Sequence, residues 1–355
     1  KTVMAYSYYS KEANPLYGDH STRATAVTLK AYSRQTFDYP YHKAISVHAK
    51  SQGMEYPMIC WNYGRPNEDG TYSDRVRYGM MSVIIHEVGH NWFPMIVGSN
   101  ERKYGWMDEG FNVYYDDLTM DHLFDTDKAL KYSYKSYKKI VDMGLEEPLT
   151  THADHFESNA AYGMAAYRKG ALTLVHLSSI MGKDVFDKAM LRYYNDWKFK
   201  HPNAVDFELI MEKESGLELS WYFDYWTKTT KVIDYSVKSV MASNDGSVVR
   251  IERVGDIPMP IDVKITYKDG SIENLHIPIR MTRGHRPILE GETLMTNWAW
   301  VNPIYAFELE KSKGEIQSIE IDPEKVLSDI NYQNNYYPNA ESTIEIKGEK
   351  IQNMN

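Results

Sequence analysis

The sequence predicts a protein of the α+β class, in which a mostly helical part is followed by a small all-β sandwich. Two observations predict this order. Up to about residue 232, apolar residues recur at spacings of three and four, which is the period of an amphipathic helix. After residue 232, short alternating runs are separated by turn signals, as in antiparallel strands. We therefore expect one domain at 1–232, a second at 233–332 and a polar tail at 333–355.

The helical part contains four segments with a clear helical period. They are 127–144, 170–182, 184–199 and 204–216. Glycines at positions 144, 182 and 216 end three of them, and glycine readily adopts the left-handed conformation that closes a helix. The segments are therefore predicted to be separate helices.

The β part contains two hairpin signals. Asn-Asp-Gly at 244–246 and Asp-Gly at 269–270 each lie between two alternating runs, and such turns join antiparallel strands. Several short strands of this kind predict a small sandwich. The tail, 333–355, has little apolar surface to bury, so we expect it to be loosely held.

The composition excludes some classes of protein. The net charge of −9 argues against a nucleic-acid surface, because phosphate binding requires a basic patch. No apolar run approaches the roughly 18–20 residues that cross a bilayer, so no transmembrane segment is expected. The single cysteine, Cys60, lies between Ile59 and Trp61 and is predicted to be a buried apolar residue.

The first candidate site is in "MSVIIHEVGHNWF", residues 81–93. His86 and His90 are four residues apart, so on a helix both rings face one side and could hold one zinc ion. Glu87 lies about 100° around the helix, which suits a base that takes a proton from zinc-bound water. The alternative is an ordinary amphipathic helix with two histidines, because this five-residue pattern also arises by chance.

A catalytic zinc needs a third protein ligand and one open position. "YGWMDEGFNVYYDDL", residues 104–118, offers Glu109, 19 residues after His90 and followed by a helical pattern. Two histidines and a glutamate form a ligand set of the hydrolytic type. Asp108 is the alternative ligand, although it also suits a helix start. Together the two segments predict a zinc site.

A ligand histidine usually donates its other N–H to a carboxylate or a carbonyl. Asp116 lies two helical turns after Glu109 on the same face, so it is the candidate partner. A solvated aspartate beside Asp117 is the alternative.

Four stretches resemble the M1 family of zinc aminopeptidases, gluzincins with a thermolysin-like catalytic domain. The resemblance covers about residues 35–230. The stretches are "HEVGHNWF" with "WMDEGFNVYYDD" at the family's gap of 18 residues, "QGMEYP" in place of the exopeptidase motif, "AYGMAAYRKGALTL" around the family's Tyr-x-Lys-Gly, and "YPYHKAISVHAKSQGMEYP", which leads into the exopeptidase motif.

The resemblance implies a role for each matching residue. His86, His90 and Glu109 would hold one zinc ion per chain, and Glu87 would be the general base. In the exopeptidase motif, Gly53, Met54 and Glu55 would bind substrate, with Glu55 on the free α-amino group. Tyr167 would donate a hydrogen bond to the tetrahedral intermediate, with Tyr162 as the alternative.

The implied function is an aminopeptidase acting on peptides with a free N-terminus. The alternatives are an endopeptidase and a non-catalytic binding module of the same fold. Gln52 and Tyr56 depart from the exopeptidase motif, which affects the expected shape of the first specificity pocket. Beyond strands expected within residues 1–30, we find no counterpart of the family's N-terminal β domain or of its C-terminal helical domain. The resemblance favours a secreted or periplasmic bacterial enzyme, with a cytoplasmic one as the alternative.

Overall fold

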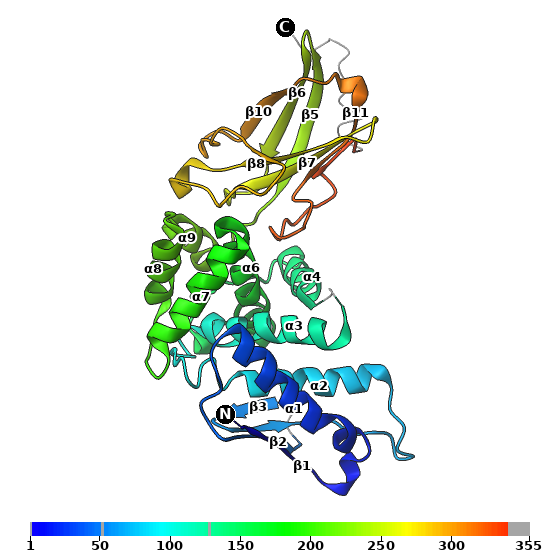
Figure 1. The fold of residues 1–355 in the computed structure, drawn as a ribbon, viewed down its shortest axis with the longest axis vertical. Helices are drawn as coiled ribbons and strands as arrows, with labels where there is room; N and C mark the ends of the chain where they lie inside the picture. Colours follow the sequence, from blue (N-terminus) through cyan, green and yellow to red (C-terminus); the bar gives the residue numbers. More distant parts are fainter. Residues whose placement is uncertain (1, 51–52, 127–128, 340–355) are drawn as a thin grey trace. The chain divides into compact units, whose positions relative to one another are not determined.

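The structure, a computed structural model, describes residues 2–50, 53–126 and 129–339 (Figure 1). It contains both helices and strands, so the predicted α+β class is confirmed. The chain divides into two compact units. Unit 1 comprises residues 1–174 and 187–211, and unit 2 comprises residues 175–186 and 212–355. The domain boundary expected at residue 232 stays a prediction.

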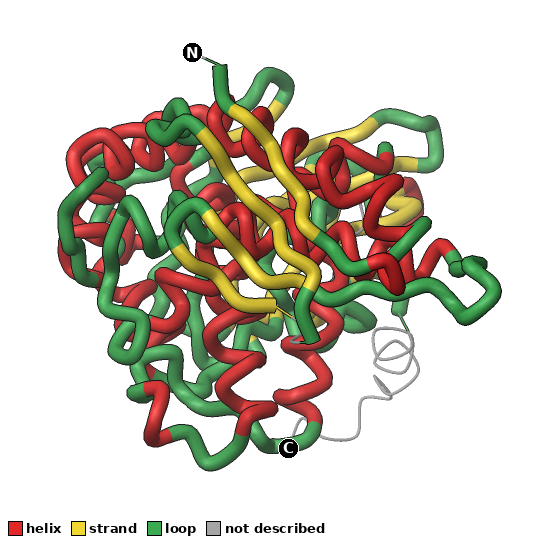
Figure 2. The backbone as a smooth tube through the Cα atoms, turned by 90° about the horizontal axis from the view of Figure 1, so that it is seen from below, coloured by secondary structure: helices red, strands yellow, loops and turns green. Residues whose placement is uncertain are grey.

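A four-stranded sheet forms one layer of unit 1. Its order is β1-β2-β4-β3, with β3 antiparallel to β4 and the other pairs parallel. Figure 2 shows the strands side by side with helices behind them, and α1 and α2 are the helices that contact the sheet. The strands are β1 (Met4–Tyr8), β2 (Lys43–His48), β3 (Gly53–Tyr56) and β4 (Ile59–Asn62).

Helix α1 (Leu16–Gln35) corrects one expectation. The strands expected within residues 1–30 are limited to β1, because residues 16 onward form a helix. Its buried positions, among them Leu16, Ala24, Leu29 and Tyr32, lie on one side at helical spacing. Small side chains along this face let α1 pack closely against its neighbours.

Three helical elements carry the first two candidate motifs. They are α2 (Asp74–Gly89), the π-helical segment η2 (Trp106–Gly110) and α3 (Phe111–Phe124). Ser73 begins α2 as an N-cap, because its side chain accepts a hydrogen bond from the Val76 amide. α5 (Asn159–Gly163) and a second π-helical segment, η4 (Met164–Lys169), lead into α6.

The four predicted helices are confirmed. They are α4 (Ala129–Asp142), α6 (Gly170–Met181), α7 (Lys183–Trp197) and α8 (Ala204–Ser215), and a fifth, α9 (Ser220–Lys228), follows. The glycines at 144, 182 and 216 have φ of 67°, 82° and 69°, the left-handed conformation expected after a helix end.

An aromatic core lies between helical elements of unit 1. The ring centroids of Phe111 and Phe207 are 4.8 Å apart, and those of Phe93 and Tyr194 are 5.0 Å apart. Trp106 is 1% exposed and packs edge-on against Phe111. Because Phe111 and Trp106 flank Glu109 in sequence, this core holds the segment that carries the third candidate ligand.

Unit 2 contains two sheets. The first has the order β10-β6-β5 and is antiparallel, and the second has the order β12-β11-β7-β8-β9 with only β8 and β9 parallel. Both predicted hairpins are confirmed, β5–β6 at Asn-Asp-Gly and β7–β8 at Asp-Gly. The strands are β5 (Tyr235–Ser243), β6 (Gly246–Arg253), β7 (Ile261–Tyr267), β8 (Ile272–Ile277), β9 (Glu292–Leu294), β10 (Ile304–Leu309), β11 (Ile316–Ile321) and β12 (Tyr336–Tyr337).

The start of the expected polar tail differs from the prediction. Residues 336–337 form β12 beside β11, and Asn335 is fully buried, with its carbonyl accepting a hydrogen bond from the Ile321 amide. Backbone pairing and the burial of Tyr337 hold this segment. Residues 340–355 lie outside the described residues.

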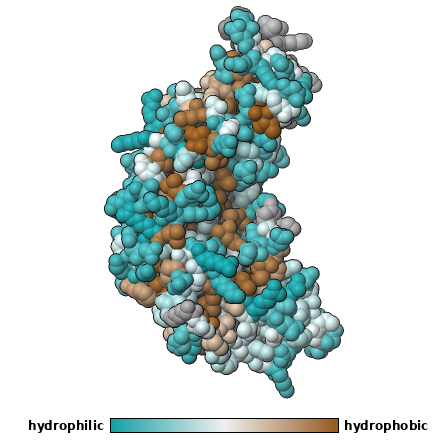
Figure 3. Space-filling view, in the orientation of Figure 1, coloured by the Kyte–Doolittle hydropathy of each residue, from teal (hydrophilic) through white to brown (hydrophobic). Residues whose placement is uncertain are grey.

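The visible surface of the protein is largely hydrophilic. Figure 3 shows hydrophilic residues over much of the visible face, with hydrophobic groups between them. Within the described residues, none of the helices is both long and apolar enough to cross a membrane. Cys60 is buried and unpaired, as predicted.

Candidate metal centre and active site

Three donor atoms from α2 and η2 converge on one point. His86 Nε2 lies 3.0 Å from His90 Nε2 and 3.0 Å from Glu109 Oε2, and His90 Nε2 lies 3.3 Å from the same Glu109 oxygen. Ligand atoms around a tetrahedral zinc ion are separated by about 3.3 Å, given metal–ligand distances of about 2.0–2.2 Å. The three predicted ligands therefore meet at the spacing of a metal site.

The other ring nitrogens fix the tautomers of both histidines. His86 Nδ1 lies 2.6 Å from Asp116 Oδ2, and His90 Nδ1 lies 2.8 Å from the Phe93 carbonyl oxygen. A carbonyl can only accept, so Nδ1 of His90 carries the proton and its Nε2 keeps a lone pair toward the cluster. The structure thus brings Asp116 to His86, where the sequence prediction put a carboxylate.

Charges around the cluster favour a cation. Burial and His90 lower the pKa of His86, but hydrogen bonds to Asp116 and Glu109 outweigh them and raise it to about 10. Burial raises the pKa of Glu109, but His90 and His86 outweigh it and hold it well below its usual range. The carboxylates thus favour positive charge where the imidazoles meet, and a divalent cation supplies it. This donor set fits zinc.

Two residues outside the cluster fix α3 against α2. The side-chain amide of Asn112 donates to the His86 carbonyl at 2.7 Å, and the Tyr32 hydroxyl donates to Asn112 Oδ1 at 2.8 Å. Gly89 leaves room for both groups, because a Cβ there would clash with them. The Gly in His-Glu-x-Gly-His thus permits the close approach that aligns the two motifs.

Glu87 lies beside the cluster without joining it. Its side chain is buried, and its Oε2 has no hydrogen-bond partner among the described residues. Burial raises the pKa of Glu87 to about 7, against the effects of His86 and His90. An unsatisfied buried carboxylate with a pKa near neutrality is typical of a general base that meets its partner only when substrate arrives.

The exopeptidase-like motif lies on β3, next to this carboxylate. A Cβ at Gly53 would clash with Glu87 Oε1, so only glycine fits here while the carboxylate keeps this position. Glu55 and Met54 line a cavity of about 260 Å³ together with His86 and Glu87. Gln52 lies outside the described residues.

Two further acids line this cavity and were not predicted as substrate ligands. They are Asp108 and Glu101. An oxygen of Asp108 lies 3.1 Å from His90 Nδ1, the nitrogen that faces away from the cluster, so Glu109 rather than Asp108 meets both Nε2 atoms. No sequence signal singled out Glu101, because an exposed acid in a loop has no distinguishing pattern.

Tyr167 reaches the cluster from η4. Its hydroxyl donates to Glu109 Oε1 at 2.7 Å, and its ring stacks on His86 with centroids 5.7 Å apart. Burial, followed by the charge of Glu109, raises the pKa of Tyr167 far above its usual value, so the phenol stays a donor. Tyr162, the predicted alternative, lines the same cavity but lies edge-on to Tyr167 at 6.4 Å.

A close backbone crossing brings η4 and η2 together. A Cβ at Gly110 would lie 2.6 Å from Gly170, and a Cβ at Gly170 would lie 2.9 Å from Gly110. Neither position can hold a larger side chain without moving the backbone. Gly110 and Gly170 therefore allow the close crossing that brings Tyr167 within reach of Glu109.

Known proteins are similar to this chain in sequence. The chain is 28% identical over 237 residues to Aminopeptidase M1 of Arabidopsis thaliana, covering 64% of this chain and 26% of that protein. It is 26% identical over 257 residues to the mitochondrial Aminopeptidase 2 of Saccharomyces cerevisiae, covering 68% and 26%. The chain thus spans about a quarter of the length of these relatives.

A solved structure also matches. The crystal structure of Legionella pneumophila aminopeptidase A in complex with aspartic acid aligns with a TM-score of 0.65 at 15% sequence identity, covering 92% of this chain and 36% of that one. The likeness establishes a shared fold. Residues 23–226, more than half of the chain, match the sequence model of the Peptidase family M1 domain. This protein therefore belongs to peptidase family M1.

Proposed function

We propose that this protein is a zinc-dependent aminopeptidase that removes N-terminal residues from peptides. The observation that carries the proposal is the convergence of His86, His90 and Glu109 beside the unsatisfied carboxylate of Glu87. We further propose a thermolysin-like catalytic domain at 1–232 followed by a β-sandwich at 233–332. The change from helices to two sheets along the chain supports this arrangement.

One zinc ion would be held by His86, His90 and Glu109, with Asp116 orienting His86. When bound, zinc supplies a Lewis acid that polarises the scissile carbonyl and makes water a stronger acid. Glu87 takes a proton from the attacking water and returns it to the leaving amine.

Tyr167 stabilises the negative charge that develops on the carbonyl oxygen. Its phenol remains protonated and can donate to that oxygen. In the free protein this hydroxyl donates to Glu109 Oε1, so it changes acceptor when the negative charge develops on the carbonyl oxygen. Such a switch stabilises the transition state more than the ground state, which is what raises kcat.

Glu55 anchors the substrate α-ammonium group. It shares a cavity with Asp108 and Glu101, so an ammonium there meets several carboxylates. A charge-assisted contact of this kind favours substrates with a free amino terminus. The anchor places the first peptide bond beside Glu87, which limits cleavage to one residue at a time.

The test compares one peptide with a free and an acetylated N-terminus on zinc-loaded protein. We expect hydrolysis of the free peptide only, with release of a single residue. Equal rates on both would reject the aminopeptidase and favour an endopeptidase. Protein that neither binds zinc nor hydrolyses either peptide would favour a binding module.

A further inference from the structure

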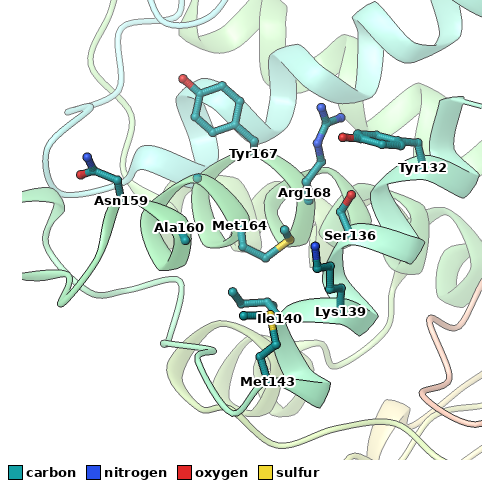
Figure 4. Close-up of a pocket in the computed structure, with 11 residues that line it drawn as sticks. Tyr132, Ser136, Lys139, Ile140, Met143, Asn159, Ala160, Met164, Tyr167 and Arg168 are labelled. Carbon is teal, nitrogen blue, oxygen red and sulfur yellow. The ribbon is translucent and has the colours of Figure 1, made fainter.

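A second cavity extends the active site away from the amino anchor. It has a volume of about 500 Å³ and lies between α4 and η4 (Figure 4). Tyr132, Tyr167 and Arg168 line both this cavity and an adjoining one of about 530 Å³, which is also lined by His86 and Glu87. The space beside the catalytic residues therefore continues past Tyr167 into the second cavity.

This second cavity is cationic. Arg168 and Lys139 line it, and no acidic side chain does so among the described residues. Neither cation forms an ion pair with a described residue, although the whole chain carries a net charge of −9. Figure 4 shows both side chains on the same side of the cavity, with Ser136 between them. Two cations in a hollow, neither in an ion pair with a described residue, favour an anionic ligand.

The guanidinium of Arg168 is held in position by contacts that are not ion pairs. It lies over the Tyr132 ring at 4.7 Å from the centroid, and it donates to Ser133 Oγ at 3.4 Å. Asp117 interacts electrostatically with this guanidinium, and it accepts a hydrogen bond from the same Ser133 hydroxyl at 3.3 Å. Burial and Asp116 raise the pKa of Asp117 to about 8, against the effects of Arg168 and Ser133, and the guanidinium itself contacts the Tyr132 ring and the Ser133 hydroxyl.

The two sides of the catalytic centre thus differ in charge. Glu55, Glu101 and Asp108 lie on the side of the amino anchor, where the one lining arginine, Arg102, is paired with Asp154 at 2.6 Å. Arg168 and Lys139 lie on the other side, without an ion pair to a described residue. We propose that Arg168, assisted by Lys139, binds a carboxylate in the part of the substrate that follows the scissile bond. The proposal rests on the proposed aminopeptidase function. The carboxylate is either the C-terminus of a short peptide or an acidic side chain.

Two substrate pairs distinguish these sources. Leucyl-glycyl-glycine is compared with its C-terminal amide, and leucyl-glutamic acid amide with leucyl-glutamine amide, with leucine release measured by mass spectrometry. In at least one pair we expect kcat/KM to favour the carboxylate about tenfold, as for one charge-assisted contact of about 1.4 kcal/mol. The pair that responds identifies the source.

Variants test whether Arg168 causes the preference. In Arg168→Gln the ratio of the two kcat/KM values should fall below twofold, whereas Arg168→Lys should keep part of it. Lys139→Gln should reduce the ratio less. Lys138→Gln is the matched control, because Lys138 pairs with Asp142 and does not line the cavity; its ratio should equal that of the wild type.

Equal rates within both pairs, or a preference that survives Arg168→Gln, would overturn the proposal. Leucyl-coumarin carries no carboxylate after the scissile bond, so it separates the two levels of failure. If leucyl-coumarin is hydrolysed but neither pair shows a preference, only the role of Arg168 is rejected and the aminopeptidase function stands. No hydrolysis of leucyl-coumarin or of any peptide rejects the aminopeptidase function, and the carboxylate site with it.

Discussion

At the level of single residues, Gly53 controls the position of the base. A side chain at this position would meet Glu87 Oε1, the far end of a flexible side chain, and Val83 Cγ1 at 3.1 Å. Gly53→Ala should therefore displace the carboxylate without unfolding the strand. A shift of about 1 Å can reduce turnover about 10²-fold, so we expect a loss of that order in kcat.

The matched control is Gly79→Ala on the helix that carries the histidines. A Cβ there has nothing within 4 Å, so the change should stabilise α2 by about 1 kcal/mol and leave kcat unchanged. Steady-state kinetics and thermal unfolding of both variants provide the comparison. Unaltered kcat in Gly53→Ala would mean that the approach of Gly53 to Glu87 is not needed for catalysis.

Sequence reasoning at this level succeeds where spacing alone decides. His86 and His90 share a face of α2, and Asp116 lies two turns after Glu109, so helical geometry predicts which side chains of each segment point the same way. The choice between Asp108 and Glu109 does not. Neighbouring residues point about 100° apart, and only the packing of η2 on α2 decides which carboxylate faces the histidines.

At the level of elements, a buried ion pair ties η4 to the loop that follows α4. Lys169 Nζ lies 2.6 Å from Glu146 Oε1, and their side chains are 1% and 8% exposed. Lys169→Met would leave the Glu146 carboxylate buried opposite an apolar side chain. We expect a loss of about 3–5 kcal/mol in the free energy of unfolding, measured by urea denaturation.

Two further variants test whether the loss of stability comes from leaving a buried charge unpaired or from removing any lysine that forms an ion pair. Lys138→Met removes an exposed pair with Asp142 on α4, and it should cost less than about 1 kcal/mol. The double variant Lys169→Met with Glu146→Leu should recover most of the loss, because no unpaired charge stays buried. A small effect of Lys169→Met alone would contradict the importance of this pair.

The elements differ in how well the sequence predicts them. α4, α6 and α8 end near glycines and carry a regular period, and both hairpins have their turn residues, so local rules suffice. The π-helical segments η2 and η4 are not visible in a 3.6-residue period. They arise where Gly110 and Gly170 let two backbones meet, which is a tertiary effect. The cationic cavity likewise joins segments that are distant in sequence.

At the level of the whole molecule, buried acids make stability depend on pH. Burial raises the pKa of Asp322 from its ordinary value of 3.8 to about 6, even though it accepts hydrogen bonds from the Val326 and Leu327 amides. The folded state thus binds this proton more tightly than the unfolded state. Its contribution is complete below pH 3.8 and decreases as pH rises through about 6, by about 3 kcal/mol.

Asp322→Asn removes this titration. Asparagine also loses an acceptor oxygen, so the variant should be less stable at every pH, and the informative quantity is its difference from the wild type. That difference should shrink by about 2 kcal/mol between pH 4 and 6.5 in urea unfolding. Parallel curves for the two proteins would show that Asp322 does not titrate in this range.

Zinc should stabilise the folded molecule as well as support catalysis, because its ligands come from two separate elements of unit 1, α2 and η2. A ligand that binds only the folded state adds about 4 kcal/mol at a thousand times its dissociation constant. For a unit of this size we expect zinc to raise Tm by roughly 10 °C, and a chelator to reverse the change.

Glu87→Gln should keep the full shift while losing turnover, since Glu87 holds no metal. His86→Ala should lose both the shift and turnover. If zinc moved the Tm of His86→Ala as much as that of the wild type, the ion would be binding elsewhere, and the three-ligand centre would be wrong.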